Sequence, residues 1–203
     1  MLFCACGTRY TNHSVIIQAE SLLNEHPDSA YKLLSSITYP EQLPEPDYAA
    51  WCLHYTHAQY KLYMDIKSDS LIKIAVDYYA NTKLRKYSGT SYYLLGCISE
   101  LLHDKDGAML SYKNASIALE NSSEYNILGL INFNMGYVYR LDRNFYQANS
   151  CYKKSLNYFN LTGNKLYQFH SCVEITDMLL RLEYPLDSVM FYSNKSLKLS
   201  QEI

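Results

Sequence analysis

A helical hairpin pattern occurs twice in this chain, with an offset of 40 residues between the two copies. The equivalent positions carry residues of matching size: Gly96 and Gly136, Ala108 and Ala148, Tyr112 and Tyr152, Ala115 and Ser155. A fixed period of this length indicates stacked supersecondary units, each of which packs on its neighbours. The chain is therefore predicted to be an all-α array of hairpins that offers an extended binding surface.

The spacing inside each copy supports close packing of the two helices. Steps of four and three residues place Ala148, Tyr152 and Ser155 on one helical face. A glycine such as Gly136 costs about 1 kcal/mol inside a helix, and a close helix crossing compensates for that cost. Neither Gly96 nor Gly136 lies in a glycine-rich loop after a strand, so we do not interpret them as phosphate-binding glycines.

Weaker copies of the pattern flank these two. The segment around Arg181 and Leu197 parallels that around Arg140 and Leu156 with an offset of 41. We expect a short N-terminal tail, 1–13, followed by a single repeat domain, 14–203, without strands. The domain should contain about five hairpins, at 14–38, 46–83, 88–121, 125–160 and 164–201.

The pattern resembles the tetratricopeptide repeat (TPR). In the segment 129–162 the matching positions are Met135-Gly136, Tyr139, Phe145, Ala148, Tyr152 and Ser155. The family's tryptophan and closing proline are missing, and the period is 40 instead of about 34, so we expect a longer connection around Glu120 to Asn126. The resemblance implies a right-handed superhelix whose first helices line a concave groove.

The same resemblance implies which side chains face that groove. They are Tyr93, Cys97 and Glu100 in one repeat, Phe133, Tyr137 and Arg140 in the next, and Glu174, Met178 and Arg181 in the last. A packing role is an equal alternative for each of them. The implied ligand is another protein or a peptide. The 22 tyrosines suit either role, because a tyrosine ring packs while its hydroxyl stays at a wet edge.

Other kinds of chemistry lack sequence support. The net charge of −2 and the interspersed charges exclude the clustered basic face typical of nucleic-acid binding. Nucleotide-binding, hydrolase and kinase motifs are missing, so we expect neither an enzyme nor a cofactor. His54 and His57 could hold a metal only with a third ligand, and none is supplied nearby. A helical enzyme whose pocket converges on these two histidines and an acidic residue is the remaining alternative.

The N-terminus carries a different signal. Small residues precede Cys6 and a polar segment follows it, as in a bacterial lipoprotein, where that cysteine would carry the lipid. Only Met1, Leu2 and Phe3 stand where a basic segment and an apolar segment are required. Either the chain begins downstream of its natural start, which we favour, or the similarity is accidental.

A second resemblance is based on three segments, 26–37, 57–79 and 91–115. With them, nearly the whole chain, 14–200, resembles the repeat region of TPR-containing, membrane-associated regulators of Gram-negative bacteria. That resemblance implies an extracytoplasmic sensing or docking region in the cell envelope, held by a lipid anchor. The alternative is a self-contained cytoplasmic adaptor or chaperone-like protein. We also expect an unfinished apolar face at Val189, Leu197 and Leu199, through which the chain self-associates.

Overall fold

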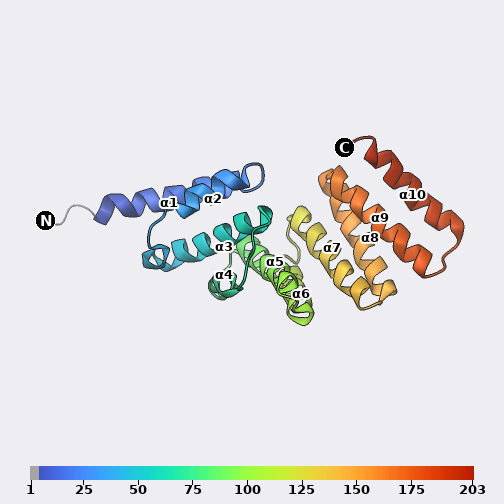
Figure 1. The fold of residues 1–203 in the computed structure, drawn as a ribbon, viewed down its shortest axis with the longest axis horizontal. Helices are drawn as coiled ribbons and strands as arrows, with labels where there is room; N and C mark the ends of the chain where they lie inside the picture. The colour runs from blue at the N-terminus through green and yellow to red at the C-terminus, as the bar shows by residue number, and fades with distance from the viewer. Residues whose placement is uncertain (1–4) are drawn as a thin grey trace. The chain divides into compact units, whose positions relative to one another are not determined.

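The computed structural model describes residues 5–203, with side chains from residue 12 onward, and this part of the chain contains no strand (Figure 1). Its elements are α1 (Ala5–Leu22), α2 (Pro27–Ser35), the short 3₁₀ helix η1 (Pro40–Gln42), α3 (Glu45–Lys61), α4 (Ser70–Ala80), α5 (Arg85–Leu101), α6 (Lys105–Ala118), α7 (Tyr125–Leu141), α8 (Phe145–Thr162), α9 (Lys165–Arg181) and α10 (Leu186–Ser200). The all-α prediction is confirmed.

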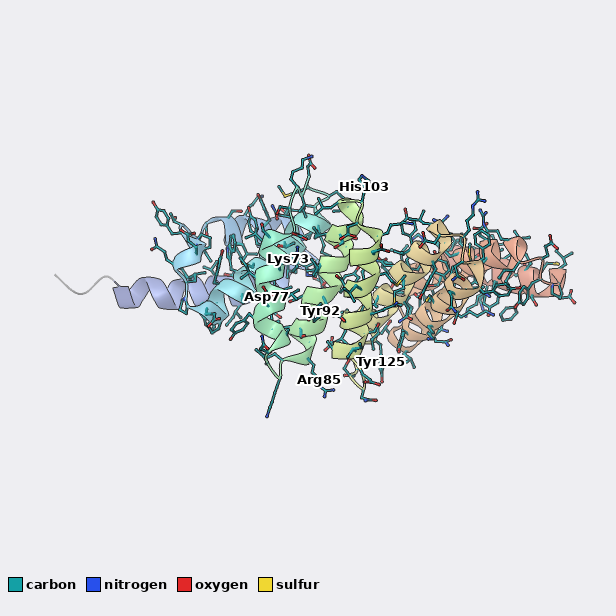
Figure 2. All side chains as sticks on the ribbon, turned by 90° about the horizontal axis from the view of Figure 1, so that it is seen from below. Lys73, Asp77, Arg85, Tyr92, His103 and Tyr125 are labelled. Atoms are coloured by element: carbon teal, nitrogen blue, oxygen red, sulfur yellow. The ribbon has the colours of Figure 1, made fainter. Side chains whose placement is uncertain are left out.

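Helix α4 shows how the sequence produces these elements. Its apolar residues recur at helical spacing, so one face is buried: Ile72, Ala75, Val76 and Tyr79. Lys73 and Asp77 lie one turn apart and are exposed (Figure 2). Lys73 pairs with Asp69 across 2.7 Å, a surface ion pair that contributes little to stability. Burial of the apolar face therefore fixes where this helix lies.

The first helices of four hairpins, α3, α5, α7 and α9, are each 17 residues long and follow one another at a step of 40. Two residues after each helix the backbone turns left-handed, with φ between 53° and 62°, at Tyr63, His103, Arg143 and Glu183. The next residue then donates its N–H to the carbonyl five residues back, over 2.8 to 3.0 Å, as in a Schellman cap. The period of 40 thus extends over the first helices of four hairpins.

The chain forms two compact units, with the boundary inside α6 between Ala108 and Met109. In unit 1, which ends at Ala108, α1 packs on α2, α2 on α3, α3 on α4 and α4 on α5. In unit 2, Met109–Ile203, the sequence of contacts is α7 on α8, α8 on α9 and α9 on α10. Contacts between consecutive helices are characteristic of a repeat array. The prediction that 14–203 acts as a single domain stays a prediction.

The glycine predicted at the hairpin crossing is in close contact with its partner helix. A Cβ on Gly136 would stand 2.7 Å from Cε1 of Tyr152, nearer than any real contact. Tyr112 and Tyr152 are both fully buried, as are Ala108 and Ala148. Their equal burial confirms that these positions are equivalent in successive repeats.

At the N-terminus the expected domain boundary does not coincide with the start of a helix. Helix α1 begins at Ala5, so the boundary expected after residue 13 falls inside a helix. The side chain of Cys6, the predicted lipidation site, lies outside the described residues.

The C-terminal face was also predicted only in part. Val189 and Leu199 are buried, whereas Leu197 is exposed. Val189 and Leu199 lie on the side of α10 that packs into the core of unit 2 with Leu179 and Ile175. The open face of α10 is therefore made by other residues.

Candidate functional site

A polar cluster joins two first helices of unit 2. Tyr137 and Arg140 lie on one face of α7, three residues apart. The Nε of Arg140 lies 3.4 Å from an Oε of Glu174 on α9, and its Cζ stands 5.2 Å from the centre of the Tyr137 ring. Tyr137 remains 37% exposed. We call Tyr137, Arg140 and Glu174 the inner cluster.

The inner cluster lies over the buried hydroxyl of Tyr152. That hydroxyl and the Nε of Arg140 make no well-directed hydrogen bond to any described residue. Burial and the nearby Glu174 carboxylate raise the pKa of Tyr152. Burial alone would lower the pKa of Arg140, but Glu174 together with the Tyr152 and Tyr137 hydroxyls outweighs burial, and the pKa of Arg140 is raised. The guanidinium is therefore held in its charged form beside an exposed aromatic ring.

Glu174 occupies a position that recurs from one repeat to the next. One period earlier, Asn134 of α7 donates its amide to the hydroxyl of the buried Tyr112 over 3.1 Å. Glu174 occupies the equivalent position near Tyr152, at a step of 40 in both helices, but without a well-directed hydrogen bond to its hydroxyl. A first-helix side chain thus approaches the buried tyrosine of the preceding second helix in both cases. In the later repeat this side chain is charged, which creates the pairing site for Arg140.

The structure assigns Phe133 and Met178 to packing. Met178 is fully buried in the core of unit 2, against which Phe133 packs. The Phe133 ring meets the Tyr152 ring edge to face, with centroids 5.3 Å apart. Met178 was aligned with Tyr137 by the offset of 41, but α9 follows α7 at a step of 40.

The step of 40 makes Val173, Asp177 and Leu180 the α9 counterparts of Phe133, Tyr137 and Arg140. Val173 and Leu180 are exposed, as expected for residues on an open face. Only the second helix, α10, follows its counterpart α8 at 41, because the turn before it has one more residue. This additional residue explains the misplacement of Met178 in the last repeat.

Arg181, also predicted at the groove, is an exposed residue with two neighbours. Its Nε donates to Asp177 over 2.8 Å, and its Cζ lies 5.3 Å from the centre of the Phe145 ring. The contact with Phe145 turns Arg181 toward α8. It therefore lies apart from the inner cluster, and its role in binding stays a prediction.

In unit 1 the predicted groove residues are less accessible. Tyr93 and Cys97 are buried on α5, and Glu100 is half-buried near its end. Burial of Cys97, like that of Cys151, agrees with its interpretation as a small apolar residue. Tyr93 and Cys97 are therefore better described as packing residues than as contacts for a partner.

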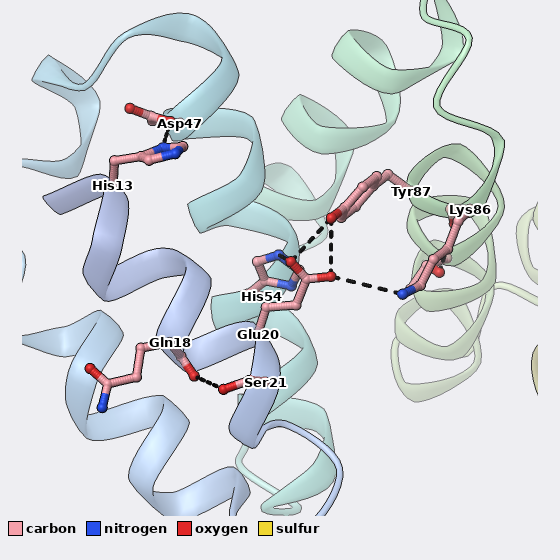
Figure 3. Close-up of polar contacts among 9 residues, drawn as sticks. His13, Gln18, Glu20, Ser21, Asp47, His54, Lys86 and Tyr87 are labelled. Carbon is pink, nitrogen blue, oxygen red and sulfur yellow. Dashed lines mark hydrogen bonds and ion pairs between the residues drawn. The ribbon is translucent and has the colours of Figure 1, made fainter. Parts of the chain in front are cut away.

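Unit 1 contains a polar cluster that no sequence pattern predicts. Glu20 of α1 accepts hydrogen bonds from the Tyr87 hydroxyl at 3.1 Å to each carboxylate oxygen (Figure 3). His54 of α3 places its Nε2 3.6 Å from the same carboxylate, and the ammonium of Lys86 lies 4.0 Å away. Glu20 and Tyr87 are 67 residues apart in the sequence. Their contact depends on the packing of three helices, so no local motif could reveal it.

His54 is the buried member of this cluster. Burial lowers the pKa of His54 to about 4, although Glu20 acts in the opposite direction. Its Nδ1 has no hydrogen-bond partner among the described residues. Burial also lowers the pKa of His57, and Lys61 adds to that effect. Both histidines are therefore neutral near pH 7.

The part of the chain that the structure describes contains no group of three or more metal-binding side chains. The pair His54 and His57 thus gains no third ligand among these residues. Glu20 is the acidic residue that approaches His54, but it is engaged by the Tyr87 hydroxyl.

An open cleft of about 810 Å³ lies between the end of α6, the start of α7 and α8. The connection from Leu119 to Ser122 forms one wall, at the place where the sequence predicted additional residues. Tyr125 and Tyr158 stack beside it with ring centroids 6.2 Å apart. This cleft is a second candidate surface in unit 2.

Solved structures with the same fold support the architecture. MamA AMB-1 superposes with a TM-score of 0.63 at 15% identity, over 95% of this chain and 99% of MamA. Aspartyl phosphate phosphatase F from Bacillus subtilis gives a TM-score of 0.70 at 14% identity, over 96% of this chain. This chain spans about half of the phosphatase, since 52% of that protein is covered. No protein-family model matches the sequence, and no curated protein matches it either.

These similarities show a TPR-like helical-repeat fold. At such low identity they establish the fold alone. Among the described residues, no helix combines the length and the hydrophobicity needed to cross a bilayer.

Proposed function

We propose that this protein is a scaffold that binds a protein or peptide segment, and that the inner cluster of unit 2 is a principal contact. The observation that carries the proposal is the partly exposed Tyr137 ring next to the guanidinium of Arg140, which forms an ion pair with Glu174. Tyrosine and arginine are enriched among the residues that dominate binding energy. The ion pair with Glu174 and the contact with the Tyr137 ring restrict the Arg140 side chain, so less side-chain entropy is lost when a partner binds.

The neighbouring α9 positions extend this surface. Val173 and Leu180 are exposed apolar side chains one period after Phe133 and Arg140. A peptide that contacts both helices would meet an aromatic ring, a cation and two aliphatic side chains. We therefore expect selected ligands to contain an acidic residue next to large apolar residues.

The test begins with selection from a displayed random-peptide library on the 203-residue chain. Affinity for the selected peptide is then measured by calorimetry. Replacing both Tyr137 and Arg140 by alanine should weaken binding at least about tenfold, with unchanged helicity by circular dichroism. The matched control replaces Tyr146 and Lys113, which are exposed on α8 and α6.

Equal loss of affinity in the control would indicate a general effect of removing surface side chains. Full retention by the Tyr137 and Arg140 double variant would move the site, and the cleft beside Tyr125 would be examined next. Failure to select any peptide would contradict the binding proposal itself.

We further propose that the chain acts at the cell envelope as part of a membrane-associated regulator. The support is the lipoprotein-like sequence around Cys6 and the resemblance of the repeats. The cytoplasmic adaptor is the alternative location. An in-frame basic and apolar segment encoded upstream of Met1 would support the envelope, and an in-frame stop codon immediately upstream would contradict it.

A further inference from the structure

The outer face of α10 carries a stripe of exposed apolar side chains. Leu186, Met190 and Leu197 are 68%, 50% and 61% exposed. They are separated by four and seven residues, so they lie on one face of the helix. A different face of α10, with Val189 and Leu199, packs into unit 2.

The preceding repeat shows what kind of element covers this stripe. At the offset of 41, the α8 counterparts of Leu186, Met190 and Leu197 are Phe145, Asn149 and Leu156. Asn149 and Leu156 are buried, and Phe145 packs against the core that includes residues of α9. At two of these three positions, Phe145 and Leu156, α8 therefore shares a core with the helix that follows it. The same positions on α10 are suited to receive a helix.

The charges beside the stripe favour α10 itself as that helix. Asp187 lies near the start of α10 and Lys198 near its end, and both are exposed. An antiparallel pairing that sets Leu186 opposite Leu197 of the second copy brings Asp187 beside Lys198 of the second copy. Two-fold symmetry repeats each contact, as in any isologous dimer. The net charge of only −2 adds little overall repulsion between copies.

We propose that the outer face of α10 is a dimerisation surface, on which α10 of a second copy packs antiparallel. The pairing buries Leu186, Met190 and Leu197 in both copies, and Asp187 and Lys198 flank them with opposite charges. One helix pair falls at the small end of specific interfaces, below about 1,200 Å², so the dimer forms reversibly with concentration. This interaction is separate from binding at the inner cluster.

Sedimentation equilibrium of the complete chain over a range of concentrations tests the proposal. The wild-type protein should show a monomer–dimer equilibrium with a dissociation constant in the micromolar range. Leu197→Gln should abolish the dimer, because it places a polar group in the apolar stripe. Asp187→Lys and Lys198→Glu should each weaken the dimer about tenfold, because each sets like charges side by side.

The combined Asp187→Lys and Lys198→Glu variant should recover wild-type dimerisation, because the exchanged charges again face each other. Lys113→Glu, an equal change of charge on α6, is the control and should have no effect. A wild-type chain that stays monomeric at all concentrations would overturn the proposal. So would a dimer that the single reversals leave intact, or one that the double reversal fails to restore.

Discussion

Gly136 lacks a side chain because the Tyr152 ring occupies the space where a Cβ would stand. The two residues come from different helices, so their contact sets the distance between α7 and α8. The buried Tyr152 hydroxyl lies next to Arg140 and Glu174. A single close approach therefore links the core of the hairpin to the inner cluster on its surface.

Gly136→Ala tests that contact, because the sign of the change in the free energy of unfolding distinguishes a tight crossing from an open helix. In an open helix the change would stabilise by about 1 kcal/mol. Here we expect destabilisation by about 1–3 kcal/mol, because the ring must move. Urea unfolding followed by circular dichroism provides the measurement, with the exposed Asn160→Ala on α8 as control. A stabilised Gly136→Ala variant would show that the crossing is loose.

His54 gives unit 1 a defined response to pH. Its pKa in the folded chain is about 4, below the value of about 6.5 in an unfolded chain. Between these two values the unfolded chain binds a proton that the folded chain does not, so stability falls as the pH drops from 6.5 to 4. The surrounding charges are Glu20, which favours the protonated form, and Lys86, which opposes it.

We therefore expect unit 1 to lose about 1–2 kcal/mol between pH 7 and pH 5. Thermal unfolding at several pH values measures the loss. His54→Gln should reduce the dependence on pH, whereas the exposed His26→Gln should leave it unchanged. An unaltered slope in His54→Gln would assign the effect to other groups, with His57 the first candidate.

At the scale of the helix, the four equivalent turns have the same backbone and different side chains. Tyr63, His103, Arg143 and Glu183 all adopt the left-handed conformation that glycine tolerates best. The backbone hydrogen bond that ends each first helix offsets the cost of this left-handed conformation. Glycine at one of these positions should therefore raise the free energy of unfolding.

Tyr63→Gly should stabilise the protein by about 0.5–1 kcal/mol, because the relief of left-handed strain exceeds the added entropy of the unfolded chain. Tyr63 is 96% exposed, so the change removes almost no packing. Tyr63→Ala keeps the strain and serves as control. Denaturant midpoints measure both variants, and equal midpoints would mean that the left-handed turn carries no penalty.

The same turns explain what the sequence could reveal about these elements. The pairs Gly96 and Gly136, and Tyr112 and Tyr152, identified two repeats because packing constrains their side chains. The turns are constrained by backbone conformation instead, and several residue types can adopt it. The hairpin of α3 and α4 therefore shows no clear repeated residue pattern. The additional residue before α10 then shifted the alignment in the last repeat. As a result Met178 was assigned to the groove, although it lies in the core.

At the scale of the molecule, helical class and repeat length were predictable, and contacts between distant residues were not. Arg140 and Glu174 were both expected on a groove, yet their pairing required the relative positions of α7 and α9. The role of Glu20 could not be predicted from the sequence, because its partners are contributed by α3 and α5. Division into two compact units was likewise not predicted, since each helix contacts mainly its sequence neighbours.

The constant step of 40 between first helices also bears on how such a chain can change in length. Joining Leu101 directly to Asp142 would remove 40 residues, and the junction would again be a 17-residue helix followed by the same turn. Recombination between equivalent points of two gene segments can therefore subtract or add 40 residues without shifting the register of any later helix. Every such event would lengthen or shorten the surface available to a partner by one hairpin.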